Sequence, residues 1–341
     1  MTYTPRQSVI IKTPLRVTLG GGGTDLPFYS SQRGGYLISA AIDEYISVTM
    51  ASRPLDQKIL VQTTATQFAA SIDQVENDIV RETLRYFKRT EAIQVAIVST
   101  IPTGIGLGSS SARIVGMVRA LATLNGQDLS AIEVASIAHH IERDILGFPG
   151  GVQDQYIASL GGLQIITVEP SGKVSAQRLV LKEDILRETE HKLVLIYSGK
   201  ERDSHKIIKS QEVNIQDKIK IYDSIKKIAV TSIDLLKAGD IAGFGQAMDE
   251  HWQLKKKLSG EMSDDNIDQQ YLELKKMGST GGKLVGAGGG GFFMMAVPGD
   301  VDDYIQKVCA LDYKVLDWCF DSQGSHVIDQ VACPQLDQVE V

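Results

Sequence analysis

The sequence has little of what marks secreted, membrane or nucleic-acid-binding proteins. Its 341 residues include three cysteines, Cys309, Cys319 and Cys333, with no C-x-x-C pair, which argues against a disulfide framework and against a zinc ribbon. Lysine and arginine total 35 against 42 aspartate and glutamate residues, a net charge of −7. This balance argues against an extended basic face, so we expect no nucleic-acid partner.

Long hydrophobic runs are also lacking. The longest apolar and glycine-rich run, residues 284–297, is too short and too rich in glycine to span a bilayer, and residues 1–16 lack the apolar core of a signal peptide. The histidines show no H-E-x-x-H spacing, so no transition-metal site is expected. Because 43% of the residues are hydrophobic and 23% are charged, the composition predicts a globular protein, which we expect in the cytoplasm without membrane association.

The coarse order of predicted elements is α+β. The sequence predicts strands at residues 8–19, 35–50, 58–63, 92–100, 163–168, 191–197, 283–285 and 292–297, and a final strand pair. It predicts helices at 78–89, 109–124, 130–146, 152–159, 215–238, 240–258, 264–277 and 301–311, with an irregular polar stretch at 169–190. Strands and helices do not alternate strictly, which argues against a doubly wound sheet.

Glycines cluster in three loops, at residues 20–23, 104–108 and 286–291. In the middle one, Pro102, a Gly-x-Gly-x-Gly run and three serines join a predicted strand to an amphipathic helix. Glycine lets the backbone approach an anion closely, and the first-turn N–H groups of a helix have no partners within it. A plain turn with a serine N-cap would explain the glycines alone, but three consecutive serines favour a phosphate-binding loop.

Two better-known nucleotide motifs fit poorly. No Lys-Ser or Lys-Thr follows the middle loop, so it is not a Walker A motif. The third loop matches G-x-G-x-x-G at Gly286, Gly288 and Gly291, but that fingerprint needs a following helix, and residues 292–297 are predicted to be a strand. We therefore expect this loop to pack tightly against a ligand or another loop. Because the fingerprint is incomplete, an NAD-dependent oxidoreductase is only a weak alternative function.

Three motifs, in the right order, resemble the signatures of the GHMP kinases (galactokinase, homoserine, mevalonate and phosphomevalonate kinases). They are T-P-L-R-V at 13–17, P-T-G-I-G-L-G-S-S-S-A at 102–112 and K-L-V-G-A-G-G-G-G at 283–291. Ser111 stands where the signature usually has alanine, a change we expect to be harmless because both residues are small. The resemblance implies a ribosomal-protein-S5-domain-2-like domain at 1–185 and a ferredoxin-like domain at 186–341, with the active site between them.

Within the family, G-G-G-G-T-D-L-P at 20–27 and E-H-W-Q-L-K-K-K-L-S at 250–259 are similar to the D-glycero-D-manno-heptose 7-phosphate kinases. This resemblance implies ATP-dependent phosphorylation of the anomeric hydroxyl, giving the 1,7-bisphosphate. Alternatives are a fucose or galactose 1-kinase of the same family and a non-catalytic sensor of sugars or nucleotides. The implied partners are ATP, Mg²⁺ and a sugar phosphate, and a homodimer is one assembly that the sequence allows.

The resemblance also implies roles for residues in the nucleotide and metal sites. Asp154 would be the catalytic base, ionised at neutral pH because an aspartate has a pKa of roughly 4, and Arg16 would keep it ionised. Ser110 and Glu142 would bind Mg²⁺. Without these roles, Glu142 would be an ordinary exposed glutamate on a helix. Asp154 would be a first-turn aspartate that stabilises the dipole of its own helix. The triphosphate would lie on Pro102, Gly104, Gly106, Leu107, Gly108, Ser109, Ser110 and Ser111.

For the sugar, the resemblance implies that the Asp25 carboxylate accepts hydrogen bonds from hydroxyl groups. Arg202 is the first choice for the 7-phosphate, and Lys206, Lys209 and Arg33 are weaker choices, since basic side chains are usually surface charges. The remaining residues expected to shape the sugar pocket are Gly22, Gly23, Thr24, Gly288 and Gly289.

Overall fold

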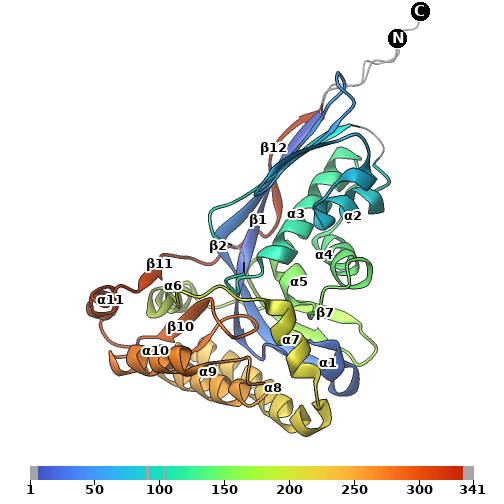
Figure 1. The fold of residues 1–341 in the computed structure, drawn as a ribbon. Helices are drawn as coiled ribbons and strands as arrows, with labels where there is room; N and C mark the ends of the chain where they lie inside the picture. The colour runs from blue at the N-terminus through green and yellow to red at the C-terminus, as the bar shows by residue number, and fades with distance from the viewer. Residues whose placement is uncertain (1–6, 90–91, 103, 333–341) are drawn as a thin grey trace, which may run out of the picture.

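Two β-sheets organise the chain, and helices pack against them (Figure 1). The computed structural model describes residues 7–89, 92–102 and 104–332. Residues 1–6, Thr103 of the middle glycine loop and Cys333 therefore lie outside the described ranges. Within those ranges no helix is long and apolar enough to cross a membrane.

The larger sheet is built on two long antiparallel strands whose alternating apolar residues fill the core. It has the order β12-β1-β2-β5-β3-β4, and β6 joins β2 while β7 joins β6. A register shift after Pro14 bends the β1–β2 pair just before Arg16. The strands are β1 (Gln7–Gly20), β2 (Gly35–Ser52), β3 (Ile59–Gln62), β4 (Thr66–Ala69), β5 (Ile93–Ser99), β6 (Leu163–Val168), β7 (Val174–Arg178) and β12 (His326–Ala332).

Helices from the first half of the chain cover this sheet. The helix α3 (Ser109–Leu124) packs on β1 and β2, and α5 (Gln153–Leu160) contacts both α3 and β1. A capping box between Ser130 and Glu133 starts α4 (Ala131–His140), which continues as a π-helical turn, η2 (Ile141–Ile145). The other elements of this half are α1 (Pro27–Arg33), η1 (Ile72–Gln74) and α2 (Asp78–Tyr86).

The smaller sheet has the order β11-β8-β10-β9, and all of its pairs are antiparallel. Long α8 lies against α9 and also reaches β1 and β2 of the larger sheet, while α9 packs on β9. The strands are β8 (Leu193–Tyr197), β9 (Gly281–Leu284), β10 (Phe292–Ala296) and β11 (Lys314–Leu316). The helices are α6 (Glu183–Lys192), α7 (Ser204–Glu212), α8 (Ile215–Ala238), α9 (Ile241–Lys256), α10 (Asp265–Lys276) and α11 (Val301–Cys309).

Two expectations about local structure were wrong, and two helices were not predicted. The polar stretch 169–190 is not irregular, because it forms β7 and most of α6. The last two strands are not a pair: β11 joins β8 in the small sheet and β12 joins β1 in the large one. The segments 27–33 and 204–212 form α1 and α7, which the sequence did not predict. The predicted boundary at residue 185 falls inside α6 and stays a prediction.

Candidate active site

A cavity of about 300 Å³ lies where the middle and third glycine loops meet. Its walls come from both sheets and from the N-terminal ends of two helices of the first half. The side chains and loops that line it include Arg16, Gly22, Asp25, the 104–111 loop, Glu142, Asp154, Arg202, His251, Lys255, Lys283 and Gly286. Segments far apart in the sequence thus contribute to one pocket.

The middle loop presents an open helix N-terminus to this cavity. Gly104, Gly106 and Gly108 have φ values of 80°, 89° and 78°, a region that favours glycine. Gly108 is the N-cap of α3, and it has no side chain to occupy the first-turn N–H groups of the helix. The first turn also has no acidic residue, so the backbone dipoles there favour an anion.

The third glycine loop packs directly against the middle loop. A Cβ built on Gly286 would lie 2.5 Å from the Gly106 carbonyl oxygen, and one built on Gly291 would lie 2.1 Å from the Ile105 carbonyl oxygen. Only glycine permits this approach, which confirms the prediction of tight packing against another loop. The strand β10 follows this loop, so a Rossmann fingerprint is excluded.

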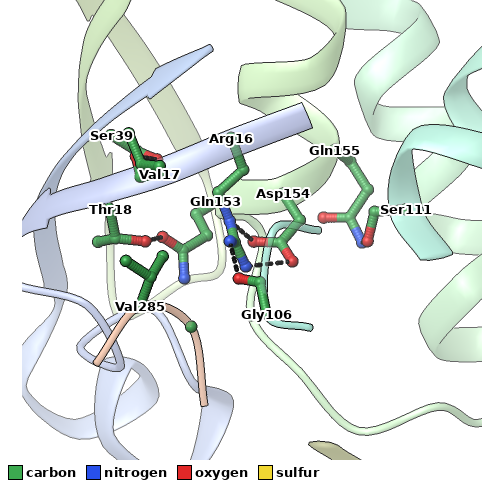
Figure 2. A network of polar contacts seen from close by, with 12 residues as sticks. Arg16, Val17, Thr18, Ser39, Gly106, Ser111, Gln153, Asp154, Gln155 and Val285 are labelled. Atoms are coloured by element: carbon green, nitrogen blue, oxygen red, sulfur yellow. Dashed lines mark hydrogen bonds and ion pairs between the residues drawn. The ribbon is translucent and has the colours of Figure 1, made fainter. Parts of the chain in front are cut away.

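Arg16 and Asp154 form a two-point ion pair beside the middle loop (Figure 2). The Arg16 Nε and Nη2 groups donate to the two Asp154 carboxylate oxygens at 2.8 Å each, and Nη1 donates to the Gly106 carbonyl oxygen at 2.5 Å. Their side chains are 6% and 20% exposed. The pair therefore fixes a carboxylate at the cavity wall while leaving part of it accessible.

Glu142 is buried rather than exposed, with only 2% of its surface accessible. One of its oxygens, Oε2, accepts hydrogen bonds from Ser111 Oγ and Gln155 Nε2, both at 2.6 Å. Ser111 therefore does more than fill the space of the usual alanine, because its hydroxyl orients this carboxylate. That the change is harmless to activity stays a prediction. Oε1 lies 3.7 Å from Arg143 Nη1, and Ser110 lines the cavity nearby.

The two carboxylate oxygens of Asp25 have different surroundings. Its Oδ2 accepts from the backbone N–H groups of Val152 and Gln153 at 2.9 and 3.1 Å, which ties the 20–27 loop to the start of α5. Its Oδ1 has no hydrogen-bond partner among the residues that the structure describes. Burial raises the pKa of this carboxyl group, although the two backbone N–H groups act in the opposite direction.

The same cavity is also lined by several basic side chains to which the sequence assigned no role. Lys255 and Lys283 are 6% and 3% exposed. Burial lowers the pKa of Lys255 to about 7 and lowers that of Lys283 well below its ordinary value. Both belong to motifs singled out in the sequence, but only the folded chain buries them together. Arg113, Arg143 and His251 also line the cavity.

Other predicted residues lie away from the cavity. Thr24 is fully buried, and its hydroxyl bonds to the Gly21 and Tyr36 carbonyl oxygens, so it shapes the turn rather than facing a sugar. Leu107 belongs to the core, and Pro102 borders a separate apolar hollow. Gly288 packs against Met262, and Gly289 packs against Ile207.

Of the basic residues predicted for the substrate phosphate, the fold brings only some to the cavity. Arg202 lines the cavity and donates through Nη1 to the Gly288 carbonyl and through Nη2 to the Val285 carbonyl at 3.3 Å. Burial, then the nearby Arg16, lower its pKa to about 9. Lys206 instead pairs with Glu261 at the surface, and neither Lys209 nor Arg33 is among the lining residues that the structure describes.

Comparison with known proteins identifies the same family in both halves of the chain. The profile of the GHMP kinases N-terminal domain matches residues 77–162, and that of the GHMP kinases C-terminal domain matches residues 232–314. The sequence is 29% identical to the D-glycero-alpha-D-manno-heptose 7-phosphate kinase of Campylobacter jejuni, over 93% of this chain and 98% of that protein. It is 24% identical to the bifunctional fucokinase/GDP-fucose pyrophosphorylase of Arabidopsis thaliana, over 93% of this chain but 33% of that protein.

The fold agrees with this result. The crystal structure of a D-glycero-D-manno-heptose 1-phosphate kinase from Bacteroides thetaiotaomicron superposes with a TM-score of 0.80 at 25% identity, covering 95% of this chain and all of that one. The galactokinase of Lactococcus lactis, at 16% identity and a TM-score of 0.71, shares the fold over 94% of each chain. The fold class predicted from the three motifs is thereby confirmed.

Proposed function

Because the chain belongs to the GHMP kinases, whose N- and C-terminal domains it carries, we propose that it is an ATP-dependent sugar kinase acting on a heptose phosphate. Its substrate would be D-glycero-α-D-manno-heptose 7-phosphate, and its product the 1,7-bisphosphate. The observation that carries the proposal is the Asp154 carboxylate, held by Arg16 next to an open helix N-terminus in a cavity rich in cations.

The nucleotide side of the reaction follows from the middle loop. The first-turn N–H groups of α3 and the glycine backbone would hold the triphosphate, and the Ser109 and Ser110 hydroxyls line the same wall. Arg16 lies between this loop and Asp154, so it can stabilise the negative charge that develops on the transferred phosphoryl group.

On the acceptor side, Asp154 would take the proton of the anomeric hydroxyl as its oxygen attacks the γ-phosphorus. The bond from this phosphorus to the β,γ-bridging oxygen breaks, and ADP leaves. The free Oδ1 of Asp25 would accept a hydrogen bond from a sugar hydroxyl, and Gly22 and Gly23 would let the sugar approach the backbone. Arg202 is the cation proposed from the sequence for the 7-phosphate.

Magnesium fits the donors on this wall. A buried glutamate carboxylate and a serine hydroxyl offer the hard oxygen ligands that Mg²⁺ prefers. Glu142 and Ser110 would hold the ion, which would neutralise phosphate charge when bound. Two hydrogen bonds fix Oε2 of Glu142, so the carboxylate is oriented before any ligand enters.

A comparison of acceptors tests this proposal. Purified protein with Mg²⁺ and ATP should form ADP much faster with D-glycero-D-manno-heptose 7-phosphate than with free fucose or galactose. A strong preference for a free sugar would reject the heptose phosphate in favour of the fucokinase-type relative. If no sugar or sugar phosphate raised ADP formation above background, the protein would be a sensor rather than a kinase.

A further inference from the structure

Two buried lysines on the wall of the cavity have no role in the reaction proposed above. Lys255 comes from α9 and Lys283 from β9, and both side chains line the cavity. His251 lies one helical turn before Lys255 on the same wall and is 1% exposed. All three are basic residues whose side chains the fold removes almost completely from solvent.

These lysines lack the acidic partners that other lysines nearby have. Between α9 and α10, Lys256 lies 3.1 Å from Asp268 and Lys275 lies 2.6 Å from Asp249. No carboxylate of the described chain comes within 4.0 Å of Lys255 or Lys283. The Lys255 ammonium donates to the Gly286 carbonyl oxygen, whereas Lys283 Nζ has no hydrogen-bond partner among the described residues.

An unpartnered buried ammonium is costly, because burial removes its hydration without replacing it. Burial is the main cause of the lowered pKa of both lysines. Arg202 and Arg16 lower the pKa of Lys255 further, and Lys255 and Arg16 lower that of Lys283 further. An anion in the cavity would supply the missing hydrogen bonds and the missing charge at once. A phosphate monoester, with up to two negative charges and three acceptor oxygens, matches this need.

The position of the cluster favours the acceptor over the nucleotide. His251 Cε1 lies 3.9 Å from the Cβ position of Gly22, in the loop proposed to hold the sugar. Asp25 of the same loop is the acidic residue that acts on Lys255. The middle loop, proposed to hold the triphosphate, is contacted by Arg16 and by both the backbone and the guanidinium of Arg202. Lys255 donates instead to Gly286 of the third loop.

We propose that Lys283 and Lys255, with His251 beside them, bind the phosphate group of the acceptor, so that this wall selects phosphorylated over free sugars. The inference rests on the proposed function and adds the determinant of its substrate class. Arg202, whose two Nη groups already donate to Val285 and Gly288, would mainly hold the third glycine loop against this site.

The test compares Lys283→Met with the control Lys256→Met, which removes a lysine of α9 that pairs with Asp268 and does not line the cavity. For Lys283→Met we expect the KM for heptose 7-phosphate to rise about 30-fold, the loss of one charged hydrogen bond, and the KM for ATP to stay within about two-fold. Methionine fills the same space without a buried charge, so the thermal midpoint should not fall. Lys256→Met should match the wild type in both KM values.

A second experiment measures how many protons the protein takes up when the sugar phosphate binds. Because an anion favours the charged form of both lysines, binding of the sugar phosphate to the wild type should take up protons. Calorimetric titrations in two buffers of different ionisation enthalpy should show this uptake, and Lys283→Met should reduce it.

The outcomes separate this inference from the proposed function. If the wild type phosphorylates heptose 7-phosphate but Lys283→Met leaves its KM unchanged, the lysine site is refuted and the kinase stands. An equal rise in the KM for ATP, or a loss of kcat alone, would place the lysine on the transferred phosphoryl group and also refute it. If the wild type prefers another sugar phosphate, the heptose assignment fails, and the same variant tests the lysines with that substrate.

Discussion

Replacing the proposed base, Asp154→Asn, is the sharpest test of the reaction chemistry. Asparagine keeps the size and one acceptor oxygen, so Arg16 retains one of its two side-chain hydrogen bonds, but no ionised carboxylate remains to accept the hydroxyl proton. General-base catalysis contributes about 10²–10⁴-fold. We therefore expect kcat to fall by at least about 100-fold, with the affinity for ATP nearly unchanged because Asp154 does not belong to the triphosphate loop.

The same variant also changes stability by an amount that the geometry limits. Breaking a fully buried ion pair costs about 3–5 kcal/mol. The Asp154 side chain is 20% exposed and Arg16 keeps its bond to Gly106, so we expect about 1–3 kcal/mol in the free energy of unfolding. A loss of this size leaves a folded protein whose kinetics can be measured.

The test measures steady-state ADP formation and equilibrium nucleotide binding. Both are compared between Asp154→Asn, the wild type and the control Asp268→Asn. Asp268 pairs with Lys256 on the surface, so this control removes a carboxylate from an ion pair away from the cavity. If Asp154→Asn turns over at the wild-type rate, Asp154 is not the base. If instead its ATP affinity falls as far as kcat, the residue acts through the nucleotide loop and the reasoning fails.

Three further changes test neighbouring groups. Arg202→Ala should raise the KM for the sugar phosphate more than the KM for ATP, because Arg202 holds the third glycine loop, to which Lys255 also donates; equal effects on both KM values would contradict a role on the acceptor side. Ser111→Ala removes one of two donors to Glu142 and should cost about 1.5 kcal/mol in urea unfolding while activity stays within a few-fold, because Gln155 still donates; a large loss of activity would contradict this. Because Lys255 has a pKa of about 7 when folded and roughly 10.4 when unfolded, the unfolded state binds more protons between these values. The ligand-free protein should therefore gain up to about 1.4 kcal/mol per pH unit from pH 7 to 10, and a Lys255→Met variant that keeps the wild-type slope would refute this cause.

Much of the fold could be predicted because its signals are local. The capping box at Ser130 starts α4 as expected, and α8 occupies the predicted range 215–238. The failures came from segments whose structure depends on distant partners. The polar strand β7 forms because β6 offers it an edge, and β11 and β12 join different sheets, a choice that no local pattern encodes.

The predictions about the candidate site show the same difference between local signals and distant partners. The family resemblance pointed to Arg16, Asp154, Glu142 and the middle loop, and the structure places all of them on the wall of one cavity. The role of Ser111 was missed because its partner, Glu142, comes from another helix. Thr24 was assigned to the sugar from its position in a motif, and only the folded turn shows that its hydroxyl is already used.

By itself the sequence determined three glycine loops, the elements that flank them and the family they resemble, because backbone freedom and helix capping depend on residues close together in the chain. Only the tertiary structure decided which charges meet. Lys255 and Lys283 lie in motifs that the sequence showed, but nothing in those motifs predicts their burial. Their altered pKa values arise because α9, β9 and the glycine loops exclude water from them together. Desolvation depends on what surrounds a group in space, and that surrounding exists only once the segments have packed.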